Sequence, residues 1–251
     1  GLVVLLMGLG TPLGEVAAVF HLINHAVFKA SLFMAAGIVD HETGTRDMRR
    51  LSGLARYMPY TATLAIIAAS AMAGVPLLNG FLSKEMFFAE TLTLAGESRL
   101  RLIFPAAAAL AGIFTVAYST RFVHDVFFGG PAKDLDPPHE APRWMRVPVE
   151  ILVVLCVVVG LAPAYTVEPL LRAAAGAVLQ QPLPAFTLAL WHGWNVPLLM
   201  SVVALAGGFA LYFWRRYRAA LHEHVPSRVQ GKNLAEGALE SLYAGAAVVW
   251  P

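Results

Sequence analysis

Residues 15–40 read EVAAVFHLINHAVFKASLFMAAGIVD, and this stretch decides the fold class of the chain. Lys29 is the only formal charge between Val16 and Val39, and most of the other positions are apolar. A membrane-spanning helix needs about 20 predominantly apolar residues to cross about 30 Å of hydrocarbon. The stretch therefore predicts a transmembrane helix over residues 16–39.

The composition of all 251 residues supports a membrane protein. Charged residues make up 14% of the chain and hydrophobic residues 58%, against about 25% and 45–50% in soluble domains. A soluble domain of this size has no interior large enough for that surplus. The formal net charge of +2 excludes a nucleic-acid binder, and the hydrophobicity excludes a disordered chain. The single cysteine, Cys156, excludes a disulfide framework and a cysteine-based metal site.

Other long stretches without Asp, Glu, Lys or Arg predict an all-α, polytopic transmembrane helix bundle. The predicted spans are residues 16–39, 60–76, 83–97 (a short one), 103–124, 148–166 and 195–214. Residues 167–182 predict an interfacial helix. Residues 1–9 and 238–251 resemble parts of an earlier and a later helix. Because the chain opens on Gly1 within an apolar run, we expect it to be an internal piece of a longer protein.

The basic residues of the connectors give conflicting signals about orientation. Five basic residues place the connector 215–237 in the cytoplasm by the positive-inside rule. Counting the predicted spans backwards puts 125–147 inside as well, but it puts 40–58 outside although that connector holds four arginines. Either the region 60–97 does not cross twice, or the connector breaks the rule. We favour two crossings and leave the conflict open.

Three titratable side chains fall in register on the first predicted span. His21, His25 and Lys29 are spaced at i, i+4 and i+8, which puts them on one helical face over about 12 Å. A charge at mid-membrane depth costs at least about 2.5–3.5 kcal/mol on insertion scales. We therefore predict a proton relay. The alternatives are a lysine that snorkels to the interface, histidines that only pack, and a zinc site, which would lack the glutamate of the H-E-x-x-H protease motif.

The stretch MAGVPLLNGFLSKEMFFAE, residues 72–90, predicts an interrupted helix around residues 74–83. Glycine, proline and asparagine fall inside one apolar run, and Ser83 is a suitable N-cap for the second half. Lys84 and Glu85 open that half. Transporters place ion sites at broken helices of this kind. An ordinary turn between two helices with a charged cap is the alternative.

A weaker group of ionisable residues lies near the end of the fourth predicted span. Arg121 and Asp125 are spaced at i, i+4, and His124 lies beside them. We favour an interfacial ion pair over an accessory role in a proton pathway. We predict no metal site.

The text HLINHAVFKASLFMAAGIVDHETGTRDMRRLSGLARYMP, followed by MAGVPLLNGFLSKEMFF, resembles a known family. It is similar to the antiporter-like membrane subunits shared by respiratory complex I and Mrp-type cation/proton antiporters. The H-x3-H-x3-K spacing and G-F-x-S-K-E carry the resemblance, which is strongest over residues 16–128. The loop text VDHETGTRD is closer to the A subunit of the Mrp-type Na+/H+ antiporter than to the complex I paralogues.

The resemblance implies roles for individual residues. Lys29 matches the central-channel lysine with His21 and His25 as its relay, and Lys84 matches the lysine of the second broken helix, near the outward exit. An essential glutamate and a further lysine of the family would lie upstream of Gly1. Residues 1–128 would be the C-terminal part of the antiporter module, 129–214 additional helices, and 215–251 a cytoplasmic connector with the start of another helix.

The resemblance also implies a secondary ion transporter rather than an enzyme, located as a multi-pass protein in the bacterial inner membrane. Its partners would be other membrane subunits, protons, and Na+ or another monovalent cation, and the resemblance implies no organic cofactor. Two alternatives stay open. One is a proton-pumping subunit of NADH:quinone oxidoreductase. The other is a membrane scaffold in which the buried lysines hold helices together.

Overall fold

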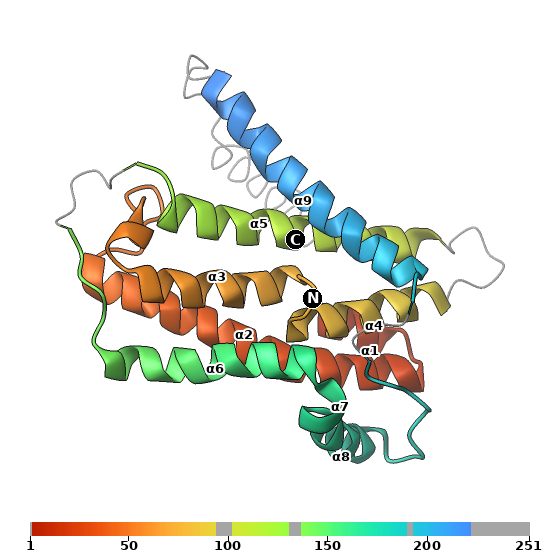
Figure 1. Ribbon diagram of the computed structural model, residues 1–251. Coiled ribbons are helices and arrows are strands. Elements are labelled where there is room, and N and C mark those ends of the chain that lie inside the picture. Colours follow the sequence, from red (N-terminus) through yellow and green to blue (C-terminus); the bar gives the residue numbers. More distant parts are fainter. Residues whose placement is uncertain (1, 94–101, 131–136, 190–192, 222–251) are drawn as a thin grey trace, which may run out of the picture. The chain divides into compact units, whose positions relative to one another are not determined.

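A computed structural model describes residues 2–93, 102–130, 137–189 and 193–221 (Figure 1). Regular structure in these residues is entirely helical, which confirms the predicted fold class. The chain divides into two compact units, Gly1–Tyr212 and Phe213–Pro251. The predicted connector end and later helix within 222–251 lie outside the described residues. The helices are α1 (Leu2–Gly8), α2 (Pro12–Thr43), the 3-10 turn η1 (Leu54–Arg56), α3 (Pro59–Ala73), α4 (Asn79–Thr93), α5 (Ile103–Phe127), α6 (Arg143–Leu161), α7 (Pro163–Thr166), α8 (Glu168–Leu179) and α9 (Val196–Leu221).

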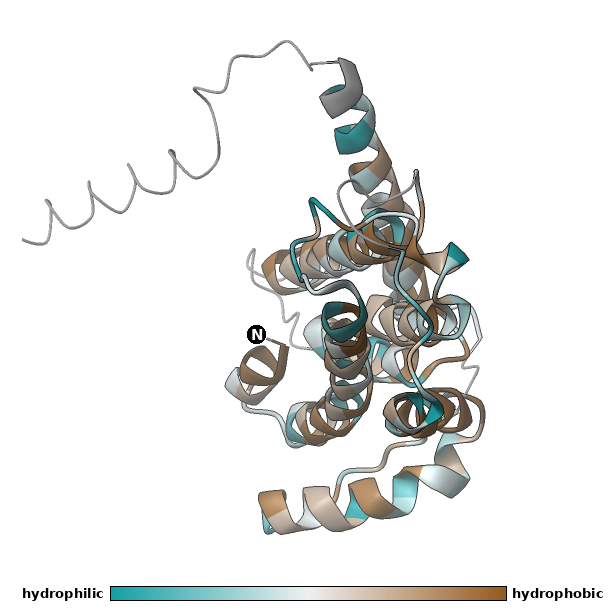
Figure 2. Cartoon of the chain, turned by 90° about the vertical axis from the view of Figure 1, so that its left-hand side faces the viewer, coloured by the Kyte–Doolittle hydropathy of each residue, from teal (hydrophilic) through white to brown (hydrophobic). Residues whose placement is uncertain are grey.

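Four of these helices, α2, α5, α6 and α9, are long and apolar enough to cross a membrane. Many of their large apolar side chains point outward, as lipid requires; Phe33 is 73% exposed and Ile151 57%. Figure 2 shows hydrophobic residues along the helices and hydrophilic residues mainly in the connectors. The chain is therefore a multi-pass membrane protein.

The helix α2 extends beyond the predicted span 16–39 at both ends because each end carries its own capping signal. The Thr11 hydroxyl accepts a hydrogen bond from the backbone N–H of Gly14, and Pro12 occupies the first turn. At the other end Gly44 adopts a φ of 67° and donates its N–H to the carbonyl of Asp40. Lys29 consequently lies near the middle of a 32-residue helix.

The helices α3 and α4 lie end to end alongside α2 and form one interrupted span (Figure 1). Each has 15 residues, or about 22 Å at 1.5 Å per residue, roughly half the length of α2. The start of α2 contacts the end of α4 through Thr11 and Glu90. The expectation that residues 60–97 cross the membrane twice is therefore wrong, since the described residues of the ranges 60–76 and 83–97 form two halves of one crossing. The end of the second range, 94–97, lies outside the described residues.

A single crossing removes the orientation conflict. The hydroxyl of Ser52 donates to the carbonyl of Phe128 at 3.3 Å, and Arg56 donates to the carbonyl of Gly129 at 3.4 Å. The connector 40–58 and the described residues of 125–147 therefore lie at the same end of the first unit. Both carry basic residues, so the positive-inside rule assigns them to the same, cytoplasmic side. The chain also leaves the first unit at this end, where Tyr212 contacts Asp125.

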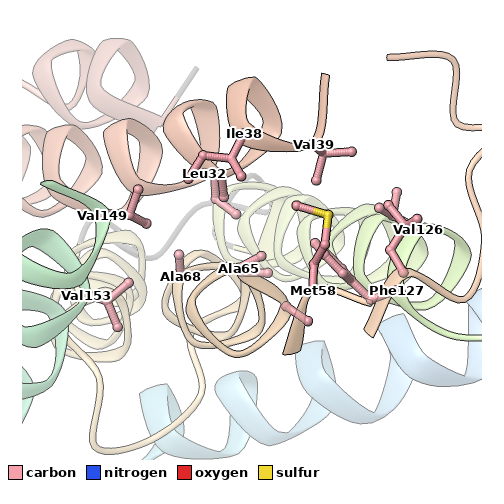
Figure 3. Packing of buried hydrophobic residues seen from close by; sticks show 14 of the residues in the cluster. Leu32, Ile38, Val39, Met58, Ala65, Ala68, Val126, Phe127, Val149 and Val153 are labelled. Atoms are coloured by element: carbon pink, nitrogen blue, oxygen red, sulfur yellow. The ribbon is translucent and has the colours of Figure 1, made fainter. Parts of the chain in front are cut away.

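The main core lies between α2, α3, α6 and the end of α5 (Figure 3). Alanines such as Ala65 and Ala68 line α3, and small side chains let the neighbouring helices approach closely. Leu32 and Ile38 of α2 and Val149 and Val153 of α6 pack in the same cluster. The core thus fixes the position of α3, whose last residue, Ala73, accepts a hydrogen bond from Lys84.

The predicted helix over 148–166 differs from the structure at both ends. The helix α6 starts earlier, at Arg143, and contains Pro148 inside the helix, where proline cannot donate the usual backbone hydrogen bond to the carbonyl of residue 144. It ends at Leu161, and Pro163 begins the separate short helix α7. Close packing explains the exact course of α6, because a Cβ on Gly160 would overlap the carbonyl oxygen of Leu77. The predicted helix within 167–182 is confirmed as α8; its interfacial position stays a prediction.

Candidate ion-translocation site

Three predicted residues follow one another along a single face of α2. The ring centroids of His21 and His25 are 5.7 Å apart. The Nζ of Lys29 lies 5.8 Å from the centroid of the Tyr118 ring on α5. His21 is buried, and His25 and Lys29 are half-buried. The register expected from the i, i+4, i+8 spacing is therefore present.

One cavity of about 250 Å³ brings all four predicted pathway residues together. His21, His25 and Lys29 reach it from α2, and Lys84 reaches it from α4. The remaining lining comes from α1, α2, α3 and α5, namely Leu2, Val3, Leu22, Phe28, Met72, Thr115 and Tyr118. Lys84 is 55 positions after Lys29 in the chain (84 − 29), so only the tertiary fold makes them neighbours.

Lys84 is anchored at the interruption between α3 and α4. The side chain is 6% exposed, and its Nζ donates to the carbonyl oxygen of Ala73 at 2.6 Å. Ala73 is the last residue of α3, where carbonyls lack helical partners and the helix dipole is negative. Gly74 has a φ of 84°, and a Cβ there would lie 2.7 Å from Cδ of Lys84. Glycine therefore both ends α3 and leaves room for the lysine.

The expectation that Ser83 caps the second half-helix is wrong. The helix α4 starts at Asn79, so Ser83, Lys84 and Glu85 lie in its second turn. The Ser83 hydroxyl donates to the carbonyl of Gly80 at 3.2 Å, and its oxygen lies 3.2 Å from Nδ1 of His21. With the serine proton used in this way, the serine oxygen accepts from the Nδ1–H of His21. Ser83 thus links His21 of α2 to α4, one position before Lys84.

Glu85 lies apart from the His/Lys cavity. It accepts a hydrogen bond from the side-chain amide of Asn195 at 3.2 Å and is 8% exposed. It lines a different cavity, of about 290 Å³, together with Met86 of α4 and Phe186. Consecutive helical residues point about 100° apart, which explains why Lys84 and Glu85 face different spaces.

The accessory group near the end of α5 forms the predicted ion pair. The Nε of Arg121 is 3.4 Å from Oδ2 of Asp125. Tyr212 of α9 donates its hydroxyl to Oδ1 of Asp125 at 2.6 Å, and the same hydroxyl lies 3.0 Å from Nδ1 of His124. None of these residues lines the His/Lys cavity. His124 instead lines a third cavity, of about 250 Å³, that Ala73 also lines.

The sequence reasoning missed several buried polar residues. Glu90 is 2% exposed and accepts a hydrogen bond from the Thr11 hydroxyl at 3.0 Å. Asn24, between the two histidines, and Asn79, at the start of α4, have buried side-chain atoms with no hydrogen-bond partner among the described residues. Glu90 stands in a predicted span and was detectable as an intramembrane ionisable residue.

Lipid-exposed helices around an interrupted span, with histidines and lysines on an internal cavity, define a class of protein. This is the architecture of polytopic membrane proteins in which ionisable residues face the bundle interior.

Comparison with known proteins identifies the family. Residues 1–109 match the family model described as NADH:quinone oxidoreductase/Mrp antiporter, TM, and the chain belongs to this family of antiporter-like membrane proteins. The resemblance found in the sequence is therefore confirmed.

Similar proteins place the chain near the branch of the A subunits. The probable K+/H+ antiporter A/B subunit of Rhizobium meliloti (strain 1021) is 56% identical over 246 residues, covering 96% of this chain and 25% of that protein. The A subunit of the Na+/H+ antiporter of Alkalihalophilus pseudofirmus is 40% identical over 238 residues, covering 84% and 30%. One protein in the structure of the Mrp complex from Dietzia sp. DQ12-45-1b superimposes with a TM-score of 0.74 at 35% identity, covering 99% of this chain and 26% of that protein. This chain spans 25–30% of the length of the two curated relatives.

Proposed function

We propose that this chain forms part of the A subunit of an Mrp-type antiporter, a multi-subunit membrane complex that exchanges protons for Na+ or K+. The observation that carries the proposal is the cavity shared by His21, His25, Lys29 and Lys84. The names of the relatives support either cation as the exchanged ion, since the Rhizobium meliloti protein belongs to a probable K+/H+ antiporter and the Alkalihalophilus pseudofirmus protein to a Na+/H+ antiporter. The resemblance adds the cell membrane as location and other membrane subunits as partners.

The proposed pathway moves protons between Lys29 and Lys84 through the two histidines. Histidine binds and releases protons near neutral pH, and a buried lysine can act as a proton carrier. All four groups are cationic when protonated. Mutual repulsion across the cavity means that a proton arriving at one group favours release from a neighbour. The pathway therefore transfers protons stepwise without accumulating charge.

Lys84 occupies the end of this pathway. When protonated, its ammonium group donates to the Ala73 carbonyl, which stabilises a charge that the membrane interior otherwise disfavours. Ala73 also lines the third cavity, next to Ser70, Ser119 and Thr120. Lys84 thus stands between two internal spaces, a suitable place to hold a proton until it leaves. In this proposal residues 1–128 form the channel half and residues 129–214 add helices to it.

The proposal is tested on the whole complex in everted membrane vesicles, because this chain holds only part of the pathway. With respiration inhibited, adding Na+ or K+ should release protons from acid-loaded vesicles, detected with a fluorescent pH probe. Vesicles without the complex are the control. A subunit of NADH:quinone oxidoreductase would instead give proton movement only with NADH and no inhibitor, which would overturn the antiporter assignment. Comparing the two cations tells which one is exchanged.

A further inference from the structure

The first turn of α3 is capped by a residue from a distant connector. Glu140, in the segment before α6, accepts the backbone N–H of Tyr60 at 2.8 Å and that of Thr61 at 3.3 Å. It also accepts the Thr61 hydroxyl at 2.6 Å. The local N-cap residue, Met58, makes no capping hydrogen bond through its side chain. Glu140 therefore supplies both the acceptors and the negative charge that a helix N-terminus favours.

The same helix ends on the carbonyl that holds Lys84. Between Thr61 and Ala73, α3 is a continuous helix lined by buried alanines that pack against α2 and α6. A helix of this length is about 22 Å long and moves as a stiff element. The carboxylate of Glu140 thus lies at the positive end of the α3 dipole, and the ammonium group of Lys84 lies at its negative end. Both charges interact favourably with the helix dipole.

We propose that Glu140 is a positioning residue for Lys84 and acts through α3. By fixing the first turn of α3, Glu140 sets the place of the Ala73 carbonyl and hence the environment of the ammonium group. Glu140 belongs to a connector on the cytoplasmic side, so movements of that connector, or of a subunit that contacts it, reach Lys84 through α3. The inference rests on the proposed function of Lys84 in proton transfer.

The prediction is tested with Glu140→Gln in the complete complex in everted vesicles. Without the charged cap, the Ala73 carbonyl is held less firmly and the protonated form of Lys84 loses part of its stabilisation. Exchange should fall about five- to tenfold, as expected for loss of a strong cap. The alkaline limb of its pH profile should move to lower pH by about half a unit or more. The other titratable groups that line the cavity with Lys84, among the described residues, are His21, His25, Lys29 and Tyr118, and Glu140→Gln replaces none of them.

Matched variants separate positioning from folding. Glu140→Asp keeps the charge and should restore most of the wild-type profile, whereas Thr61→Val removes one hydrogen bond and should shift it less than Glu140→Gln does. The control is the exposed residue next to Glu140: His139→Gln should leave the exchange rate and its pH profile unchanged. The amount of assembled complex is measured on native gels.

Three results would overturn the inference or its basis in distinguishable ways. An unchanged pH profile in Glu140→Gln contradicts positioning. So does a loss of assembled complex while the remaining complex keeps the wild-type profile, because the role is then structural only. Normal exchange in Lys84→Met contradicts the proposed function itself, whatever Glu140 does.

Discussion

Replacing Lys84 by methionine should lower the exchange rate of the assembled antiporter by about a hundredfold, the usual scale for losing a proton-transfer group. Methionine has a similar length and fills the same space, but it can neither carry a proton nor donate to Ala73. The packing around Gly74 is retained because the side-chain stem still passes over it. The rate is measured as cation-driven pH change per amount of complex in everted vesicles.

Assembly should be nearly unaffected by the same substitution. The variant leaves the Ala73 carbonyl without its donor, which costs about 1–3 kcal/mol, but it also removes the cost of burying an ammonium group. Arg172→Met is a matched control, since it deletes an exposed cation that pairs with Glu168 on α8, far along the chain from the cavity. Wild-type exchange in Lys84→Met would exclude this lysine from the pathway.

Replacing Gly80 by alanine should destabilise the complex strongly, by about 3 kcal/mol or more. The added Cβ would overlap the carbonyl oxygen of Ala71 and lie 2.8 Å from its carbonyl carbon. Backbone atoms cannot rotate away as a side-chain end can, so α4 would have to move off α3. A lower yield of folded complex and a lower thermal unfolding midpoint are the expected measurements.

Gly37→Ala provides the control for this substitution. Gly37 lies within α2, and a Cβ there would meet nothing within 4 Å. Alanine is the better helix former by about 1 kcal/mol, so this variant should be as stable as the wild type or slightly more so. If Gly80→Ala matched Gly37→Ala in yield and unfolding midpoint, the close junction of α3 and α4 would be contradicted.

The helices and the shared face of His21, His25 and Lys29 were predictable because their signals are local. Long charge-free runs indicate spans, and residues at i, i+4 and i+8 must share a helical face. The interruption was also visible in Gly74, Pro76 and Gly80. The number of membrane crossings was not predictable, because hydropathy cannot distinguish two full spans from two half-spans joined end to end.

The long-range partners were beyond the reach of the sequence. Glu140 and Thr61 are 79 positions apart, as are Glu90 and Thr11, and no local pattern marks them as pairs. Ser83 resembled an N-cap because serine favours that position. In the structure α4 starts a turn earlier, and the Ser83 hydroxyl is hydrogen-bonded to Nδ1 of His21 instead. Tertiary packing decides such cases.

The most direct test of the shared cavity as an ion pathway is Lys29→Ala in the complete complex. Lys29 is the central charge of α2 and lies in the cavity with His25 and Lys84. Na+- or K+-driven pH change in everted vesicles, with respiration inhibited and the amount of complex measured in parallel, should fall to the level of vesicles without the complex. Exchange at the wild-type rate in Lys29→Ala would contradict a pathway through this cavity.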